Sequence, residues 1–96
     1  MRSRFYFVHI NCHPRQTPNS SIEEILNREI DWVRPKGGSF YLVYSDRDAK
    51  GIKDKIKEIL DEKDDILVGE FDKTHYSGWI STMVVNWLKK ERSDNL

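Results

Sequence analysis

The apolar residues of this chain fall into seven groups, each with the spacing of a strand or a helix. Residues 4–10 form a nearly continuous apolar run, which is typical of a strand covered on both faces or nearly so. Residues 31–34 and 39–45 flank a turn at residues 35–38, and the second run is aromatic and β-branched. The proline and two glycines of the turn predict a β-hairpin, which we place in the middle of a sheet. Residues 66–71 predict a fourth strand.

Three helices are predicted between and after these strands. The first begins at Ser20 or Ser21, because each serine has a glutamate three residues later, as in a capping box. The second spans residues 48–62 with Asp46 or Asp48 as its N-cap, and the third spans residues 78–92. The apolar stripes of the first two helices are formed by Ile22, Ile25, Leu26 and Ile30, and by Ile52, Ile56, Ile59 and Leu60.

The order strand, helix, strand, strand, helix, strand, helix predicts a single α+β domain over residues 1–96. A βαββαβ chain on one four-stranded antiparallel sheet is the ferredoxin-like fold, with both crossover helices on one face. The additional C-terminal helix then covers the other face, an edge or a partner.

Charge and cysteine content narrow the classes of function. Sixteen basic and sixteen acidic residues cancel, which disfavours nonspecific coating of nucleic acid. Cys12 is the only cysteine, so neither an intrachain disulfide nor a cysteine-rich zinc site is expected. No signal peptide or run of about 20 apolar residues is seen, so we expect a cytoplasmic protein without a membrane partner.

The end of the first strand is one candidate binding site. Asn11, His13 and Arg15 follow this strand and are suited to binding an anion or orienting a substrate. An ordinary exposed loop is the favoured interpretation. A metal site needs about three protein ligands, which this segment does not offer, so no metal is expected. Cys12 beside His13 is a weak nucleophile signal, and an inert thiol is favoured.

Asp46 and Asp48, after the third strand, form a second candidate site. Two carboxylates are suited to holding Mg²⁺ for phosphodiester hydrolysis, but helix capping explains the same residues and is favoured. The aromatic residues of the first and third strands have an alternative role in stacking RNA bases, as in RNA-recognition modules, although core packing is favoured.

The third helix has more apolar residues than one helical stripe can bury. We therefore expect a homodimer with this helix at its interface. The predicted interface residues are Trp79, Met83, Val84 and Trp87.

Several short motifs carry a family resemblance. They are Trp32, residues 39–45, 52–56 and 60–70, the Gly78-Trp79 pair and residues 87–89. In these the chain resembles the SinR-like proteins, relatives of the small dimeric CRISPR-associated endonucleases that serve as scaffold in the spacer-integration complex. The resemblance implies a ferredoxin-like homodimer, in a mobile-element or defence setting.

The resemblance also bears on catalysis. In the CRISPR-associated relatives an aspartate at the end of the first strand is the proposed metal ligand, whereas Asn11 and its neighbours here include no aspartate. Asparagine brings no charge to a metal. The expected function is therefore a non-catalytic homodimeric scaffold or interaction protein without a cofactor. The alternatives are an Mg²⁺-dependent endonuclease acting on RNA or DNA, and an RNA-binding module.

Overall fold

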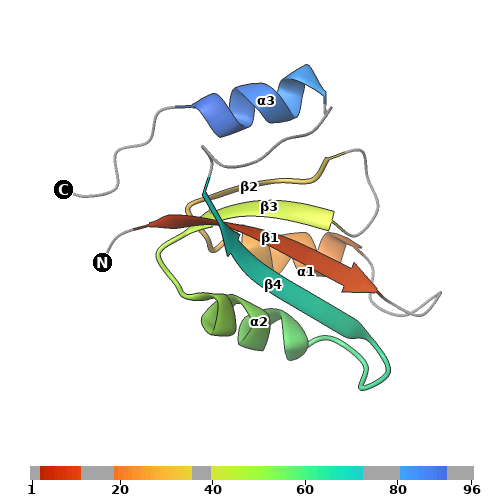
Figure 1. Cartoon of the computed structure of the whole chain (residues 1–96). Helices are drawn as coiled ribbons and strands as arrows, with labels where there is room; N and C mark the ends of the chain where they lie inside the picture. Colours follow the sequence, from red (N-terminus) through yellow and green to blue (C-terminus); the bar gives the residue numbers. More distant parts are fainter. Residues whose placement is uncertain (1–2, 12–18, 36–39, 73–80, 91–96) are drawn as a thin grey trace.

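The structure is a computed structural model that describes residues 3–11, 19–35, 40–72 and 81–90. Within these ranges it forms three helices and one four-stranded antiparallel sheet (Figure 1). The elements are β1 (Arg4–Asn11), α1 (Asn19–Leu26), β2 (Asp31–Val33), β3 (Phe40–Ser45), α2 (Ala49–Lys57), β4 (Asp65–Phe71) and α3 (Thr82–Lys89). The predicted α+β class and the order of elements are confirmed, and the topology is consistent with a ferredoxin-like fold.

The strand order in the sheet is β2-β3-β1-β4, and every neighbouring pair is antiparallel. β1 lies between β3 and β4, with Phe7 opposite Leu42 on one side and Gly69 on the other. The prediction that the β2–β3 hairpin lies in the middle of the sheet is wrong for β2. Because β1 pairs with both β3 and β4, β3 is the only strand beside β2 among the described residues, and β2 forms an edge.

The main core lies between the sheet and the two crossover helices, α1 and α2, as predicted. We call this side of the sheet the first face; on β1 it is marked by Tyr6, Val8 and Ile10. Trp32 adds an edge-on ring contact to Tyr41, with ring centroids 5.9 Å apart. The buried residues of this core are Tyr6, Val8, Ile10, Ile22, Leu26, Tyr41, Val43, Ile52 and Ile56.

The bounds of the crossover helices differ from prediction. α1 is already helical at Asn19, so Ser20 and Ser21 lie in its first turn and neither is the N-cap. α2 has Asp48 as its N-cap, one of the two predicted, but ends at Lys57. The backbone then tightens, with Ile59 N donating to Ile56 O at 3.1 Å. This turn takes Ile59 off the apolar stripe, and its side chain is 38% exposed.

Ile30 likewise lies beyond α1, in the turn before β2, and is 51% exposed. α3 is shorter than the predicted span of 78–92. Ser81 is its N-cap, accepting a hydrogen bond from Val84 N at 3.4 Å, and at Lys90 the backbone becomes extended (ψ 131°). Of that span, residues 78–80 and 91–92 lie outside the described residues.

α3 lies over the opposite side of the sheet from α1 and α2 (Figure 1). We call this side the second face; on β1 it is marked by Phe5, Phe7 and His9. The buried residues of this smaller core are Phe5, Leu42, Tyr44, Val84 and Leu88. The sequence left three positions open for the C-terminal helix. The structure shows the first of them, because the helix covers the other face of its own sheet.

Candidate functional site

Part of the second face is not covered by α3. The strand register sets His9 between Phe40 on β3 and Leu67 on β4, and sets Phe7 one row further along β1. We call Phe7, His9, Phe40 and Leu67 the open patch. Leu67 is 62% exposed and Phe40 is 39% exposed, while His9 is exposed and Phe7 half-buried. Exposed large apolar side chains that adjoin one another are typical of a contact site.

The rings of the open patch are held against one another. The Phe7 and Phe40 rings are nearly parallel, with centroids 6.5 Å apart and planes at 15°. The His9 ring centroid is also 6.5 Å from that of Phe40. Phe7 lies over β4 at Gly69, where an added Cβ would be 2.5 Å from the ring. Gly69 therefore leaves room for the Phe7 ring to lie on the sheet, and any larger residue would displace it.

The C-terminal half of α3 is fixed over the start of β1. The Trp87 ring meets the Phe5 ring edge-on at 5.7 Å, and Lys90 Nζ lies 3.4 Å from Asp31 Oδ2 on β2. α3 runs in the opposite direction to β1 (Figure 1), so its N-terminal turn is directed toward the open patch. Met83 in that turn is 57% exposed. An exposed methionine thus lies on the helix that covers the same face of the sheet as the open patch.

The four predicted interface residues have different positions. Val84 is 1% exposed and packs on its own sheet, so a partner cannot contact it directly. Trp87 is partly buried against the same core. Met83 is available to a partner, and Trp79 lies outside the described residues.

The two predicted polar sites lie at opposite ends of the sheet. Asn11 ends β1 and pairs with Asp65, whereas Ser45, just before Asp46, pairs with Arg4 at the other end of β1. The length of β1 separates them by about 23 Å at the usual rise per residue. His13 and Arg15 lie outside the described residues, as does Cys12. The structure therefore does not bring the first candidate site together with the second.

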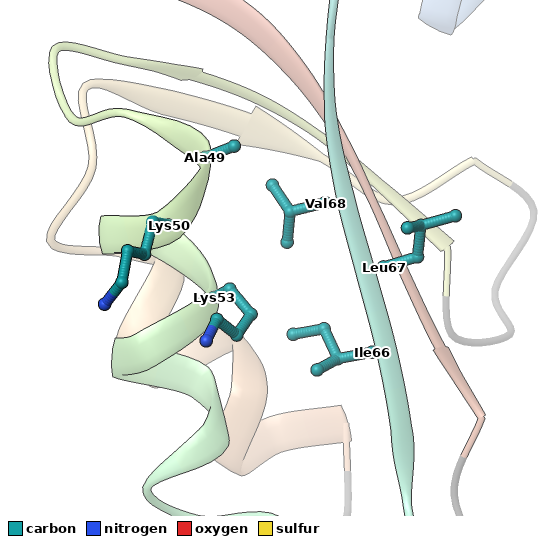
Figure 2. A pocket seen from close by; sticks show the side chains of 6 residues that line it. All are labelled: Ala49, Lys50, Lys53, Ile66, Leu67 and Val68. Atoms are coloured by element: carbon teal, nitrogen blue, oxygen red, sulfur yellow. The ribbon is translucent and has the colours of Figure 1, made fainter.

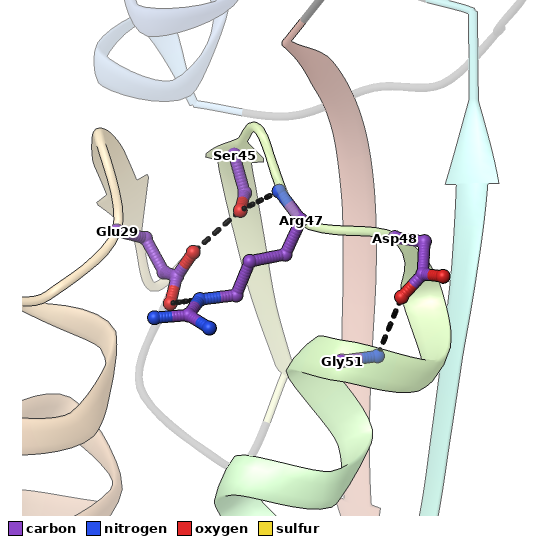
Figure 3. Close-up of polar contacts among 5 residues, drawn as sticks. All are labelled: Glu29, Ser45, Arg47, Asp48 and Gly51. Carbon is purple, nitrogen blue, oxygen red and sulfur yellow. Dashed lines mark hydrogen bonds and ion pairs between the residues drawn. The ribbon is translucent and has the colours of Figure 1, made fainter. Parts of the chain in front are cut away.

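The two aspartates after β3 have unlike surroundings. Asp48 Oδ1 accepts a hydrogen bond from Gly51 N at 2.7 Å, which is the geometry of an N-cap (Figure 3). An added Cβ at Gly51 would lie 3.1 Å from that oxygen, so the glycine gives the cap room. Asp46 is exposed. Among the described residues, no three His, Cys, Asp or Glu side chains are grouped so as to hold a metal ion.

A buried carboxylate beside these aspartates was missed from the sequence. The Glu29 side chain is 4% exposed, and its Oε2 accepts from Arg47 Nε at 3.0 Å (Figure 3). Ser45 Oγ donates to Glu29 Oε1 and accepts from Arg47 N at 2.9 Å. These bonds join the turn after α1 to the end of β3. Their donors and acceptors are matched, as expected of a structural clamp. No sequence signal distinguishes Glu29 from a surface glutamate.

Comparisons of the chain with protein-family models, curated proteins and solved structures find no match. Within the described ranges, no helix is both long and apolar enough to cross a membrane. The open patch and the exposed Met83 are therefore the features of the described residues that bear on function.

Proposed function

We propose that the protein is a non-catalytic, homodimeric interaction protein that pairs through the second face of its sheet. The observation that carries the proposal is the set of exposed side chains Leu67, Phe40 and Met83 on the α3 side of the sheet. Leu67 and Met83 are more exposed than Ile30 and Ile59, the other large apolar residues that are exposed in the described ranges. Aromatic residues and methionine are also enriched at protein interfaces.

A second copy of the chain is the partner that fits this surface most simply. A twofold axis needs only one self-complementary patch, and the open patch is apolar with a single histidine. Burying Leu67 and Met83 in an interface stabilises the dimer by about 25 cal/mol for each Å² of apolar area removed from water. The resemblance to SinR-like proteins, whose CRISPR-associated relatives are dimers, supports the same conclusion.

The surroundings of Asn11 and Asp48 support a non-catalytic role. In the CRISPR-associated relatives the proposed metal ligand is an aspartate at the end of the first strand, and the corresponding residues 9–12 here include no aspartate. Asp48 is engaged at the start of α2. Asp46 alone does not supply the two or more carboxylates that hydrolytic Mg²⁺ sites use. We therefore do not advance the endonuclease alternative.

RNA binding is the second candidate, and one observation favours it. Phe7 and Phe40 are adjacent aromatic rings on the two central strands, which is where RNA-recognition modules stack bases. However, the open patch includes neither lysine nor arginine for phosphate contacts. Protein contact is therefore the better supported use of this face.

Sedimentation across a wide concentration range tests the proposal. We expect a concentration-dependent dimer, and we expect Leu67→Glu and Met83→Glu each to shift it to monomer. Ile30→Glu is the matched control, because Ile30 is comparably exposed but lies outside the second face. A strictly monomeric wild-type protein at high concentration contradicts the proposal, as does a dimer unaffected by both variants. Saturable binding of a short single-stranded RNA, lost in Phe40→Ala, supports the second candidate instead.

A further inference from the structure

The two edges of the sheet differ in their protection against added strands. β2 has three residues and is followed by Arg34 and Pro35, and the proline has no backbone N–H to donate to an added strand. β4 has seven residues, contains neither proline nor lysine, and pairs with β1 residue by residue without a bulge. Within the described part of the chain, no strand lies on its outer side. A long, regular edge of this kind is a template for one more strand.

A groove adjoins this edge on the first face, between β4 and α2. It has a volume of about 250 Å³ and is bordered by Ala49, Lys50, Lys53, Ile66, Leu67 and Val68. Figure 2 shows Ile66 and Val68 directed toward α2, while Leu67 points to the opposite side of β4. The floor of the groove is aliphatic and has no aromatic ring on which a base could stack. It is therefore better suited to a peptide side chain than to a nucleobase.

The helical wall of the groove is basic. α2 contains four lysines and one acidic residue, Asp54, although the whole chain carries no net charge. The ammonium groups of Lys50 and Lys53 each lie 2.7 Å from an oxygen of Asp54. Their hydrogen bonds lower the pKa of Asp54 to about 2. One carboxylate shared by two ammonium groups leaves an excess positive charge at the rim, available to an incoming carboxylate.

We infer that the groove binds an extended, acidic segment of a partner protein by β-strand addition along β4. Main-chain hydrogen bonds to the open edge give affinity, and alternate side chains give specificity. An aliphatic side chain enters the groove over Ile66 and Val68, and carboxylates two residues before and after it meet Lys50 and Lys53. Each carboxylate is then about 7 Å along the strand from the aliphatic residue, so the two carboxylates are about 13 Å apart, a distance that two flexible lysine side chains can span.

This inference is independent of the proposed dimer, because it uses the first-face side of β4 and the outer edge. The two proposals can therefore fail separately. Peptide binding is expected to persist in Met83→Glu, which alters the second face and leaves the groove intact.

Fluorescence anisotropy with a labelled peptide, acetyl-Thr-Glu-Thr-Val-Thr-Glu-Thr-amide, tests the inference on the full chain. We expect saturable binding that weakens with salt, and at least tenfold weaker binding in a Lys50→Glu/Lys53→Glu variant. A Lys55→Glu/Lys57→Glu variant is the matched control, since it changes the helix by the same charge; we expect it to bind within twofold of wild type. A peptide with lysine in place of glutamate is expected not to bind.

Backbone chemistry separates strand addition from simple charge attraction. A peptide N-methylated at alternate residues cannot pair along one edge, so we expect it to lose binding while keeping its charge. Equal binding of the methylated peptide overturns the inference, as does no saturation at concentrations near about 1 mM. Self-association that is lost in Val68→Lys and that excludes the peptide assigns the edge to a second copy, and also overturns it.

Discussion

The two faces of the sheet carry similar apolar side chains but differ in how they are covered. On β1, Tyr6, Val8 and Ile10 point to the first face and are all buried beneath α1 and α2. The alternate residues point to the second face and become progressively more exposed, from buried Phe5 through half-buried Phe7 to exposed His9. Strand alternation thus produces two apolar faces, and the number and length of the covering helices decide how much of each remains exposed.

This difference predicts which substitutions should affect the stability of the domain and which should affect contact with a partner. The first face is closed by two helices and tied at its end by the Glu29 clamp, so a change there should destabilise the whole domain. The second face is covered by an eight-residue helix with two fully buried side chains, Val84 and Leu88. A change there should loosen α3 alone, and a change in the open patch should affect a partner.

Matched truncations on the two faces test this separation most directly. Ile56→Ala on the first face is expected to cost about 2–5 kcal/mol, because it leaves a cavity among helices that cannot close over it. Leu88→Ala is expected to cost less, about 2 kcal/mol, because α3 can detach and so limits the loss. Urea denaturation measures both, and hydrogen exchange should show early opening of α3 only in Leu88→Ala. Equal costs with global opening in both variants contradict the comparison.

The Glu29 clamp should give the next largest effect. Glu29→Ala leaves the fully buried Ser45 hydroxyl without its acceptor, and we expect a cost of about 1–3 kcal/mol by denaturation. Arg4→Ala is the control, since it removes a surface ion pair whose side chains are 42% and 51% exposed. That control should cost less than about 1 kcal/mol. If the Glu29 variant is as stable as the Arg4 control, the clamp does not stabilise the first face.

The cap of α2 is expected to contribute less. Asp48→Ala removes the acceptor for Gly51 N and should cost about 1 kcal/mol. Asp46→Ala, two residues away and exposed, should stay within about 0.5 kcal/mol of wild type. Thermal denaturation of the two variants side by side measures the difference. If the order is reversed, Asp46 has a role that capping does not explain.

Tyr6 should give the smallest effect, with the opposite sign. Its hydroxyl is buried on the first face and has no hydrogen-bond partner in the described structure. Tyr6→Phe is therefore expected to be neutral or to stabilise the fold by up to about 1 kcal/mol. A clear loss of stability in urea would show that the hydroxyl has a partner in solution.

Burial also raises the pKa of Tyr6 above its ordinary value of 10.0. The unfolded chain therefore releases this proton at lower pH than the folded chain. The stability that the protonated Tyr6 contributes is fully present below about pH 10 and is lost as the pH rises further. Wild type should lose more stability above about pH 10 than Tyr6→Phe does. Parallel alkaline denaturation curves for the two proteins would contradict this assignment.

The sequence predicted those features that depend on local pattern. Residues 4–10 and 66–71 are strands within one residue of the predicted bounds, and the Ile52–Ile56 stripe of α2 faces the core. Phe40 and Tyr44 have the same strand-like context, yet one is exposed and the other buried. The difference arises because α3 is short and covers only one end of the second face. The exposure of these residues depends on a tertiary contact with α3, which the sequence of the strand alone does not predict.

The candidate sites were less predictable for the same reason. Asp48 carries its own signal as a helix cap, whereas Glu29 becomes buried only because Ser45 and Arg47, distant in sequence, close over it. The β4 edge is set by strand order: the sequence indicated the strand but placed the hairpin, not β1, in the middle of the sheet.

The central place of β1 in the sheet has a consequence for folding during synthesis. β1 is synthesised before both of its partners, β3 and β4, and β4 is synthesised after β3. Among the described strands, the β2–β3 hairpin is the only pair that forms between consecutive elements. A nascent chain must therefore keep one edge of β1 unpaired until residues 65–71 emerge, and non-local pairing of this kind folds slowly. During synthesis, β1 is the segment that chaperones should protect.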